Sequence, residues 1–138
     1  MAERDPDCIF CKIVAGELPS LVVAEDDRTV AFLDVAPATP GHTVVVPKEH
    51  HRDLLTIDPE ALAACAAMAQ RVARLATERL EPAGVNVLNN CGSAAWQTVF
   101  HFHLHVVPRY VDDPLRLPWI PAAGDRDEIT ATHERLTA

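Results

Sequence analysis

Apolar and polar positions alternate most regularly between residues 99 and 107. In the segment His101–Val107, three histidines alternate with phenylalanine, leucine and valine. Successive side chains of a β-strand point to opposite faces, so the three imidazoles would share one face and the apolar side chains the other. The pattern therefore predicts a strand over residues 99–107, ended by Pro108, with one face in the core and three histidines on the other.

Shorter patterns predict most of the other elements. Residues 8–15 suit a short helix that Gly16 and Pro19 stop. Residues 21–24 and 29–33 are two apolar runs on either side of a polar turn, which is typical of a β-hairpin. Two further strands are predicted, over residues 43–46, where Pro47 follows, and over residues 85–88.

A long helix is predicted from Asp58 to about Leu80. Asp58 is a good N-cap and Pro59 fits the first helical position, while Pro82 and Gly84 stop the helix. The segment is rich in alanine, which has two explanations. Small side chains would let this helix pack closely on its twin in a dimer, or alanine is simply the best helix former.

The chain of 138 residues is long enough for one domain with a hydrophobic core, and we expect a single domain over residues 1–138. The core would span about residues 8–110. Residues 111–138 form a proline-rich tail that we expect to wrap the surface, with a short helix near 127–136. The local hairpins, one long and one short helix and a late strand predict an α+β fold with an antiparallel sheet.

Composition and charge narrow the classes of partner. Twelve Lys and Arg against 20 Asp and Glu give a net charge of −8, which argues against a nucleic-acid surface but leaves local nucleotide binding through neutral donors open. The sequence has no apolar run near 18 residues and begins with a polar segment. We therefore expect a cytoplasmic protein with no membrane partner.

The three histidines allow three interpretations. On a strand, His101 and His105 would lie about 13 Å apart, which disfavours a three-histidine metal site. A continuous apolar opposite face disfavours a merely solvated strand. In the third interpretation His103 attacks an electrophile such as phosphorus. Nearby donors would bind the anionic oxygens: Asn90, Ser93, Gln97, Thr98 and His105.

The sequence His101-Phe-His-Leu-His-Val-Val resembles the motif of the histidine triad (HIT) family. Residues 32–50 are similar to the family's second conserved block, and Asn90 and Gln97 stand at the expected distances before the triad. The opening Cys8-Ile-Phe-Cys-Lys-Ile-Val-Ala-Gly-Glu-Leu-Pro resembles bacterial members of the Hint branch. The resemblance covers residues 8 to about 110.

This resemblance implies a five-stranded antiparallel sheet that continues across a homodimer. It also implies hydrolysis or transfer of a nucleotidyl group at the α-phosphate, with purine nucleoside phosphoramidates as favoured substrates. His103 would be the nucleophile that forms a covalent nucleotidyl-histidine intermediate, His105 would contact the phosphate and help to protonate the leaving group, and His42 would assist. A dinucleoside polyphosphate hydrolase, or a nucleotide-binding interaction module with vestigial activity, are the alternatives.

Further binding residues are implied by position. Asn90, Gln97 and Thr98 would hold the α-phosphate and the leaving group, and Asp34 would accept the ribose hydroxyls. A base pocket would consist of Phe10, Ile13, Leu18, Phe32 and Val35, although each of these apolar residues also suits the core. The chain departs from the family's pattern at Trp96, where a small residue is common, and at Thr98, where the Hint branch commonly has serine.

Cys8 and Cys11 have the spacing of half a zinc site. The resemblance implies His50 and His101 as the other ligands, which would complete a closed, structural Cys₂His₂ zinc site that the chemistry does not require. His51 would point elsewhere. A redox role for the cysteine pair is disfavoured because no strand precedes it to form a thioredoxin-like unit.

Overall fold

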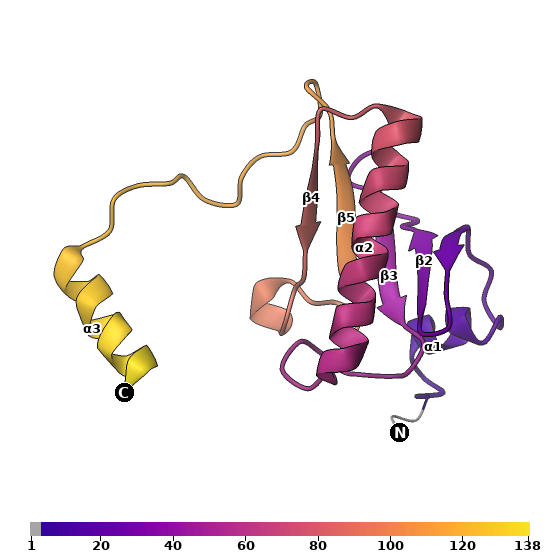
Figure 1. The fold of residues 1–138 in the computed structure, drawn as a ribbon, viewed down its shortest axis with the longest axis horizontal. Helices are drawn as coiled ribbons and strands as arrows, with labels where there is room; N and C mark the ends of the chain where they lie inside the picture. Colours follow the sequence, from indigo (N-terminus) through magenta and orange to yellow (C-terminus); the bar gives the residue numbers. More distant parts are fainter. Residues whose placement is uncertain (1–3) are drawn as a thin grey trace.

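The structure, a computed structural model, describes residues 4–138. Five strands form one antiparallel sheet in the order β1-β2-β3-β5-β4 (Figure 1). The elements in chain order are α1 (Ile9–Val14), β1 (Val22–Glu25), β2 (Thr29–Leu33), β3 (Thr43–Pro47), α2 (Pro59–Leu80), β4 (Gly84–Leu88), a 3₁₀ turn η1 (Ser93–Ala95), β5 (Leu104–Arg109) and α3 (Arg126–Thr137). The predicted α+β class and antiparallel sheet are confirmed.

Local sequence explains the turns and helix ends. In the β1–β2 turn, Oδ1 of Asp26 accepts hydrogen bonds from the backbone N–H groups of Arg28 and Thr29 and from the Thr29 hydroxyl. At the start of α2, the Asp58 side chain accepts from the N–H of Glu60. These short polar side chains replace backbone partners that a turn or a helix end lacks.

The predicted strand over residues 99–107 is wrong in its limits. β5 begins at Leu104 and runs through Pro108 to Arg109, so His101 and His103 precede the strand. Pairing with β3 covers only residues 104–106 of β5, so Pro108 lies beyond it and its missing N–H removes no bond of that ladder. The alternation persists upstream of the strand, because Phe102 is buried in the same cluster as Leu104.

The two faces of the sheet bury different side chains. The face toward α2 packs residues such as Val45 and Leu104 against Cys65, Met68 and Val72 of the helix. The opposite face carries a smaller cluster in which strand residues meet α1: Cys8, Phe10, Cys11, Val30, Phe32, Val44 and Val46. His105 pairs with Val44 across the β3–β5 ladder. The histidine therefore lies on the α1 side of the sheet.

The alanines of α2 are divided between its two sides. Ala61 and Ala69 are buried against the sheet, and Ala76 is buried as well. The outward side carries Gln70 and Arg74, both exposed. Small side chains therefore serve close helix-to-sheet packing, and a role of this helix in a dimer stays a prediction.

The C-terminal tail does not wrap the domain, contrary to expectation. Figure 1 shows an extended segment after β5 that leads away from the sheet to α3, which lies apart from the domain. Every residue from 116 to 138 is exposed. Pro114, Pro118 and Pro121 favour an extended chain, and α3 offers only Ile129 and Leu136 as large apolar side chains for burial.

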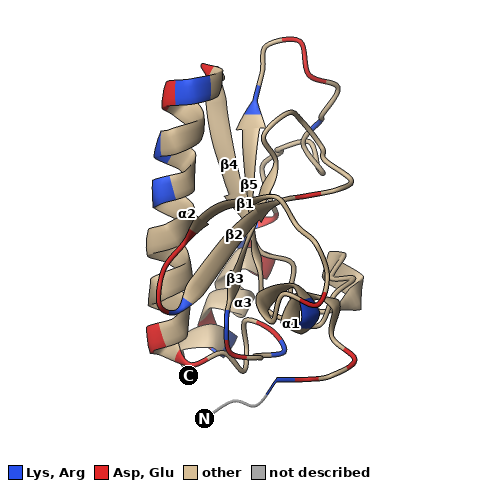
Figure 2. Cartoon of the chain, turned by 90° about the vertical axis from the view of Figure 1, so that its right-hand side faces the viewer, with Lys and Arg blue, Asp and Glu red and all other residues tan. Residues whose placement is uncertain are grey.

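Charged residues lie mainly on the loops and on the outward side of α2, while the strands carry few of them (Figure 2). Over residues 4–138, no helix has the length and apolar character needed to cross a membrane.

Gly41 provides a test of the packing around the β3 entry. Its φ is +92°, and an added Cβ would lie 2.5 Å from Leu80 Cδ1 and 3.1 Å from Pro108 Cγ. We expect Gly41→Ala to lower the free energy of unfolding by about 1–3 kcal/mol, since the backbone conformation and the space both disfavour a side chain. Denaturant unfolding measures the change. Gly84→Ala, at a site with no atom within 4 Å of the added Cβ, is the matched control, and an equal effect there would contradict the argument.

Candidate functional site

His103 presents one free ring nitrogen. Its Nδ1–H donates a hydrogen bond to the backbone carbonyl of His101, 2.8 Å away. Nε2 therefore carries the lone pair. The ring is held edge-on against Phe10, with 5.0 Å between ring centroids, and lies 4.9 Å from the ring of His105. His103 thus has a fixed orientation and an unshared nucleophilic nitrogen.

His42 and His105 form a directed pair. The backbone N–H of Ala38 donates to Nδ1 of His42 at 3.0 Å, so the proton of His42 is on Nε2. That Nε2–H donates to Nδ1 of His105 at 2.9 Å. The proton of His105 is then on its own Nε2, where it can be donated to a ligand. Oδ2 of Asp34 lies 3.5 Å from Nε2 of His42.

Burial keeps these imidazoles neutral at pH 7. Loss of solvent lowers the pKa of His103 and of His42, and it lowers the pKa of His105 to about 4 with further contributions from the neighbouring histidines. The carboxylate of Asp34 opposes the lowering at all three histidines. Neutral His103 is the form that can attack an electrophile.

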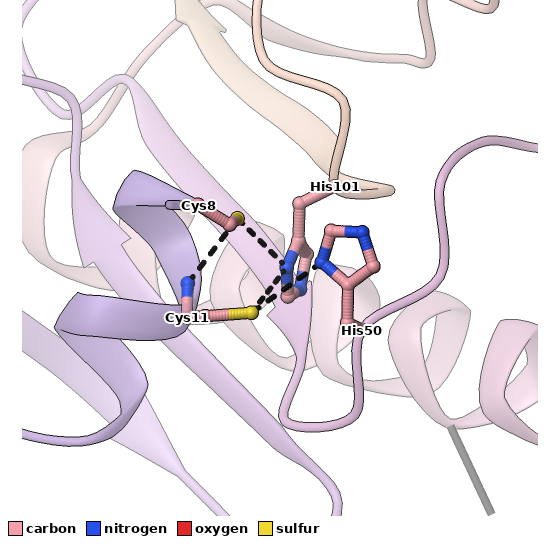
Figure 3. Close-up of side chains that lie close together, drawn as sticks. All are labelled: Cys8, Cys11, His50 and His101. Carbon is pink, nitrogen blue, oxygen red and sulfur yellow. Dashed lines mark hydrogen bonds between the residues drawn. The ribbon is translucent and has the colours of Figure 1, made fainter. Parts of the chain in front are cut away.

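The two cysteines meet two histidines at a second centre (Figure 3). Nδ1 of His101 lies 3.4 Å from Sγ of Cys8 and 3.5 Å from Sγ of Cys11, and Nδ1 of His50 lies 3.4 Å from Sγ of Cys11. The cysteines come from the start of α1, His50 from the segment after β3 and His101 from the segment before β5. All four donor atoms lie within 4.8 Å of one another.

This donor set fits a tetrahedral zinc ion. Zinc–sulfur and zinc–nitrogen bonds of the usual lengths place sulfur and nitrogen ligands about 3.5 Å apart, as they are here. Nε2–H of His101 donates to the carbonyl of Pro47 at 2.8 Å, which leaves the lone pair of Nδ1 facing the sulfurs. Burial raises the pKa of the Cys11 thiol to about 11, so binding a metal would require its proton to be displaced. His51 is outside this cluster.

A groove of about 650 Å³ opens beside His42 and His105. Asn90 and Trp96 also line it. Thr98 is exposed and is absent from the lining. Gln97 is buried, and all its main hydrogen-bonding capacity is used within the protein: Oε1 accepts from the N–H of Gly92, and Nε2 donates to the carbonyls of Arg52 and Val99. Gln97 therefore braces this loop in the structure.

The apolar residues expected to form the base pocket differ in placement. Phe10 and Phe32 are buried and meet edge to face, with 5.5 Å between centroids. Ile13 packs against the same cluster, and Leu18 is partly buried. Val35 is 98% exposed and touches no core. Asp34, next to it, accepts a hydrogen bond from the N–H of Ala36 with Oδ1.

Sequence reasoning missed Asn89. Its Nδ2 donates to the backbone carbonyl of His103 at 3.0 Å. The β4–β5 ladder ends at the pair Leu88 and His105, so this side chain ties the next part of the chain to β4. An Asn-Asn pair at a strand end gives no signal of which amide turns inward, so only the structure identifies this contact.

Comparisons with known proteins agree with these features. Residues 15–112 match the model of the HIT domain. Among curated proteins, "Protein hit" of Bacillus subtilis is 44% identical over 104 residues, which cover 75% of this chain and 72% of that protein.

Solved structures give the same result. A Streptococcus mutans protein superposes with a TM-score of 0.93 at 39% identity, covering 99% of this chain and 87% of that one. A Zn-bound histidine triad family protein from Mycobacterium smegmatis has a TM-score of 0.77 at 44% identity, with 95% and 96% covered. A histidine triad nucleotide-binding protein from Candida albicans has a TM-score of 0.84 at 33% identity, with 95% of each chain covered. With its HIT-domain match, its fold and its clustered histidines, the chain belongs to the HIT family.

Proposed function

We propose that this protein hydrolyses purine nucleoside phosphoramidates, or transfers their nucleotidyl group, through a covalent intermediate on His103. The free Nε2 lone pair of His103, beside a second imidazole that presents an N–H, is the observation that carries this proposal. Nucleotide binding agrees with the name of the Candida albicans neighbour.

The attack forms a bond between Nε2 of His103 and the α-phosphorus, and the bond from phosphorus to the leaving nitrogen breaks. The leaving amine takes up one proton. The His42–His105 pair delivers it from Nε2 of His105 when the pair carries an additional proton. The phosphate anion of the bound substrate favours that cationic form. Water then attacks phosphorus, its proton returns to the pair, and the bond to His103 breaks.

Other residues would bind the nucleotide. Asp34 keeps Oδ2 free of backbone partners and, as a pure acceptor, suits the ribose hydroxyls. Phe10 and Phe32 would face the base. Asn90, in the groove beside His105, would hold the phosphate. Thr98 would assist from the exposed loop, while Gln97 would act mainly by shaping that loop.

The groove beside His105 also supports a second candidate function. Its volume of about 650 Å³ leaves room for a large leaving group such as a second nucleotide. A dinucleoside polyphosphate hydrolase would use the same attack by His103, with a phosphate chain leaving in place of the amine.

We also propose that Cys8, Cys11, His50 and His101 bind structural zinc. The ion would supply a cross-link between α1 and the segments around β3 and β5, and no step of the reaction needs it. The distances among the four donor atoms and the zinc-bound neighbour support this proposal.

We further propose that the protein forms a homodimer with a continuous sheet. β4 is an edge strand whose Val87 and Leu88 are exposed. Unpaired backbone groups beside apolar side chains are suited to pairing with a second chain.

His103→Ala tests the nucleophile. We expect kcat to fall by at least about 10³-fold, because the attacking nitrogen is lost, while AMP binding persists. Steady-state release of AMP from an adenosine phosphoramidate, beside diadenosine tri- and tetraphosphate, measures this and separates the two candidate functions. Substantial turnover by the variant would rule out the role of His103. Binding of AMP by wild type without turnover of any of these substrates would favour the interaction module.

Zinc content tests the metal site. We expect one zinc per chain by elemental analysis of protein purified without chelator. Cys8→Ser should lower the melting temperature by about 10 °C or more, since several kcal/mol of cross-linking are lost. Cys91→Ser, at a cysteine outside the cluster, is the matched control. Absence of zinc from the wild-type protein would contradict the proposal.

The protonation of His105 has a defined pH dependence. Because burial lowers its pKa to about 4, the unfolded chain binds this proton at higher pH than the folded one. The stability contributed by neutral His105 is present above pH of about 6.5, and it is lost as pH falls toward 4. We expect NMR to show a neutral His105 ring at pH 5.5, and AMP to raise the pKa. A midpoint near pH 6.5 in the free protein would be inconsistent with this.

A further inference from the structure

Trp96 adopts a backbone conformation that tryptophan rarely takes. Its φ is +74° and its ψ is +18°, in the left-handed region. Among residues 4–138, Glu81, at the end of α2, is the other non-glycine residue with positive φ. Glycine takes this conformation freely, whereas a residue with Cβ is strained there. The sequence thus places a large side chain where the backbone disfavours any side chain.

Packing of the fold does not explain this tryptophan. Residue Trp96 is 65% exposed and belongs to neither core cluster. It lines the groove that also contains His105 and Asn90. A strained backbone that gains no buried contact points to a role in binding.

The groove lies on the leaving-group side of the reaction centre. It includes His105, whose Nε2–H would protonate the leaving group, and it includes neither Phe10 nor Phe32, which face the nucleoside in the proposed function. A group that departs past His105 would therefore enter the groove that Trp96 lines.

The groove combines apolar, aromatic and polar side chains. Leu117 and Trp119 contribute to the lining, together with Arg116, whose guanidinium donates to the carbonyl of Leu115. The guanidinium of Arg109 is occupied by Asp113 and Asn86, so it is not available as a cationic anchor for a ligand. Flat aromatic groups stack favourably on an exposed indole.

We propose that Trp96 determines specificity by stacking on a planar aromatic group carried by the leaving group. This inference rests on the proposed function and adds the class of leaving group. The aromatic group can belong to an arylalkyl amine or be the second base of a dinucleoside polyphosphate.

The experiment compares two adenosine phosphoramidates, one of phenethylamine and one of ethylamine. For wild type, we expect kcat/KM to be higher for the phenethylamine substrate. Trp96→Gly should reduce the ratio of the two kcat/KM values by about 10-fold, the typical value of one stacking contact. Trp96→Phe should retain most of the ratio because it keeps an aromatic ring. Trp119→Ala, which removes the other indole of the groove, should also retain most of it.

Thermal denaturation shows whether a Trp96 variant loses activity because it is less stably folded. Trp96→Gly should melt no lower than Trp96→Ala, since glycine accepts the positive φ that alanine does not. Diadenosine tetraphosphate is the third substrate. If Trp96→Gly lowers kcat/KM for this substrate alone, the stacking group is the second base.

The outcomes separate the two proposals. If Trp96→Gly changes neither the ratio of the two phosphoramidate kcat/KM values nor kcat/KM for diadenosine tetraphosphate, the role of Trp96 is overturned. The proposed function is then unaffected. The role of Trp96 is also overturned if Trp119→Ala removes the preference for the phenethylamine substrate and Trp96→Gly does not. Failure of wild type to hydrolyse any of the three substrates overturns both.

Discussion

The buried residue His101 connects α1, the end of β3 and the candidate nucleophile His103. Its Nε2–H is bound by the carbonyl of Pro47 at the end of β3, and its Nδ1 faces the sulfurs of Cys8 and Cys11. Its backbone carbonyl accepts the Nδ1–H of His103. One residue therefore joins α1 to the sheet and also fixes the tautomer of the candidate nucleophile. The candidate metal site and the candidate reaction centre share this backbone while using different side-chain atoms.

The three imidazoles of the site are neutral although its substrate would be anionic, and the charged group beside them is itself an anion, the carboxylate of Asp34. Burial holds the three imidazoles around the reaction centre uncharged, and the charged residues lie mostly on loops and on α2 (Figure 2). Neutral N–H donors, here Nε2 of His105 and the amide of Asn90, can contact phosphate oxygens without requiring a buried cation that would be costly in the free protein. An acidic protein can in this way hold a nucleotide locally.

The sequence predicted the elements well where local chemistry determines them. Asp58-Pro59 marks the start of α2, and the acidic turn marks the β1–β2 hairpin. The start of β5 was mispredicted because alternation describes side-chain direction, whereas a strand also needs partners, and the ladders begin at Leu104 and His105. The prediction of four candidate metal ligands came from a resemblance, since no local pattern brings residues 8 and 101 together.

The type of a residue did not always predict its role or its burial. Gln97 has the donors expected of a phosphate ligand, yet they donate to the backbone carbonyls of Arg52 and Val99. Val35 is apolar yet fully open to solvent. Because the carbonyl of Pro47 holds the His101 ring in addition to the cysteines, the position of the backbone that orients His103 does not depend on the candidate zinc site alone. Replacement of the cysteine pair would leave that hydrogen bond, and with it one of the two supports of the His101 ring, in place.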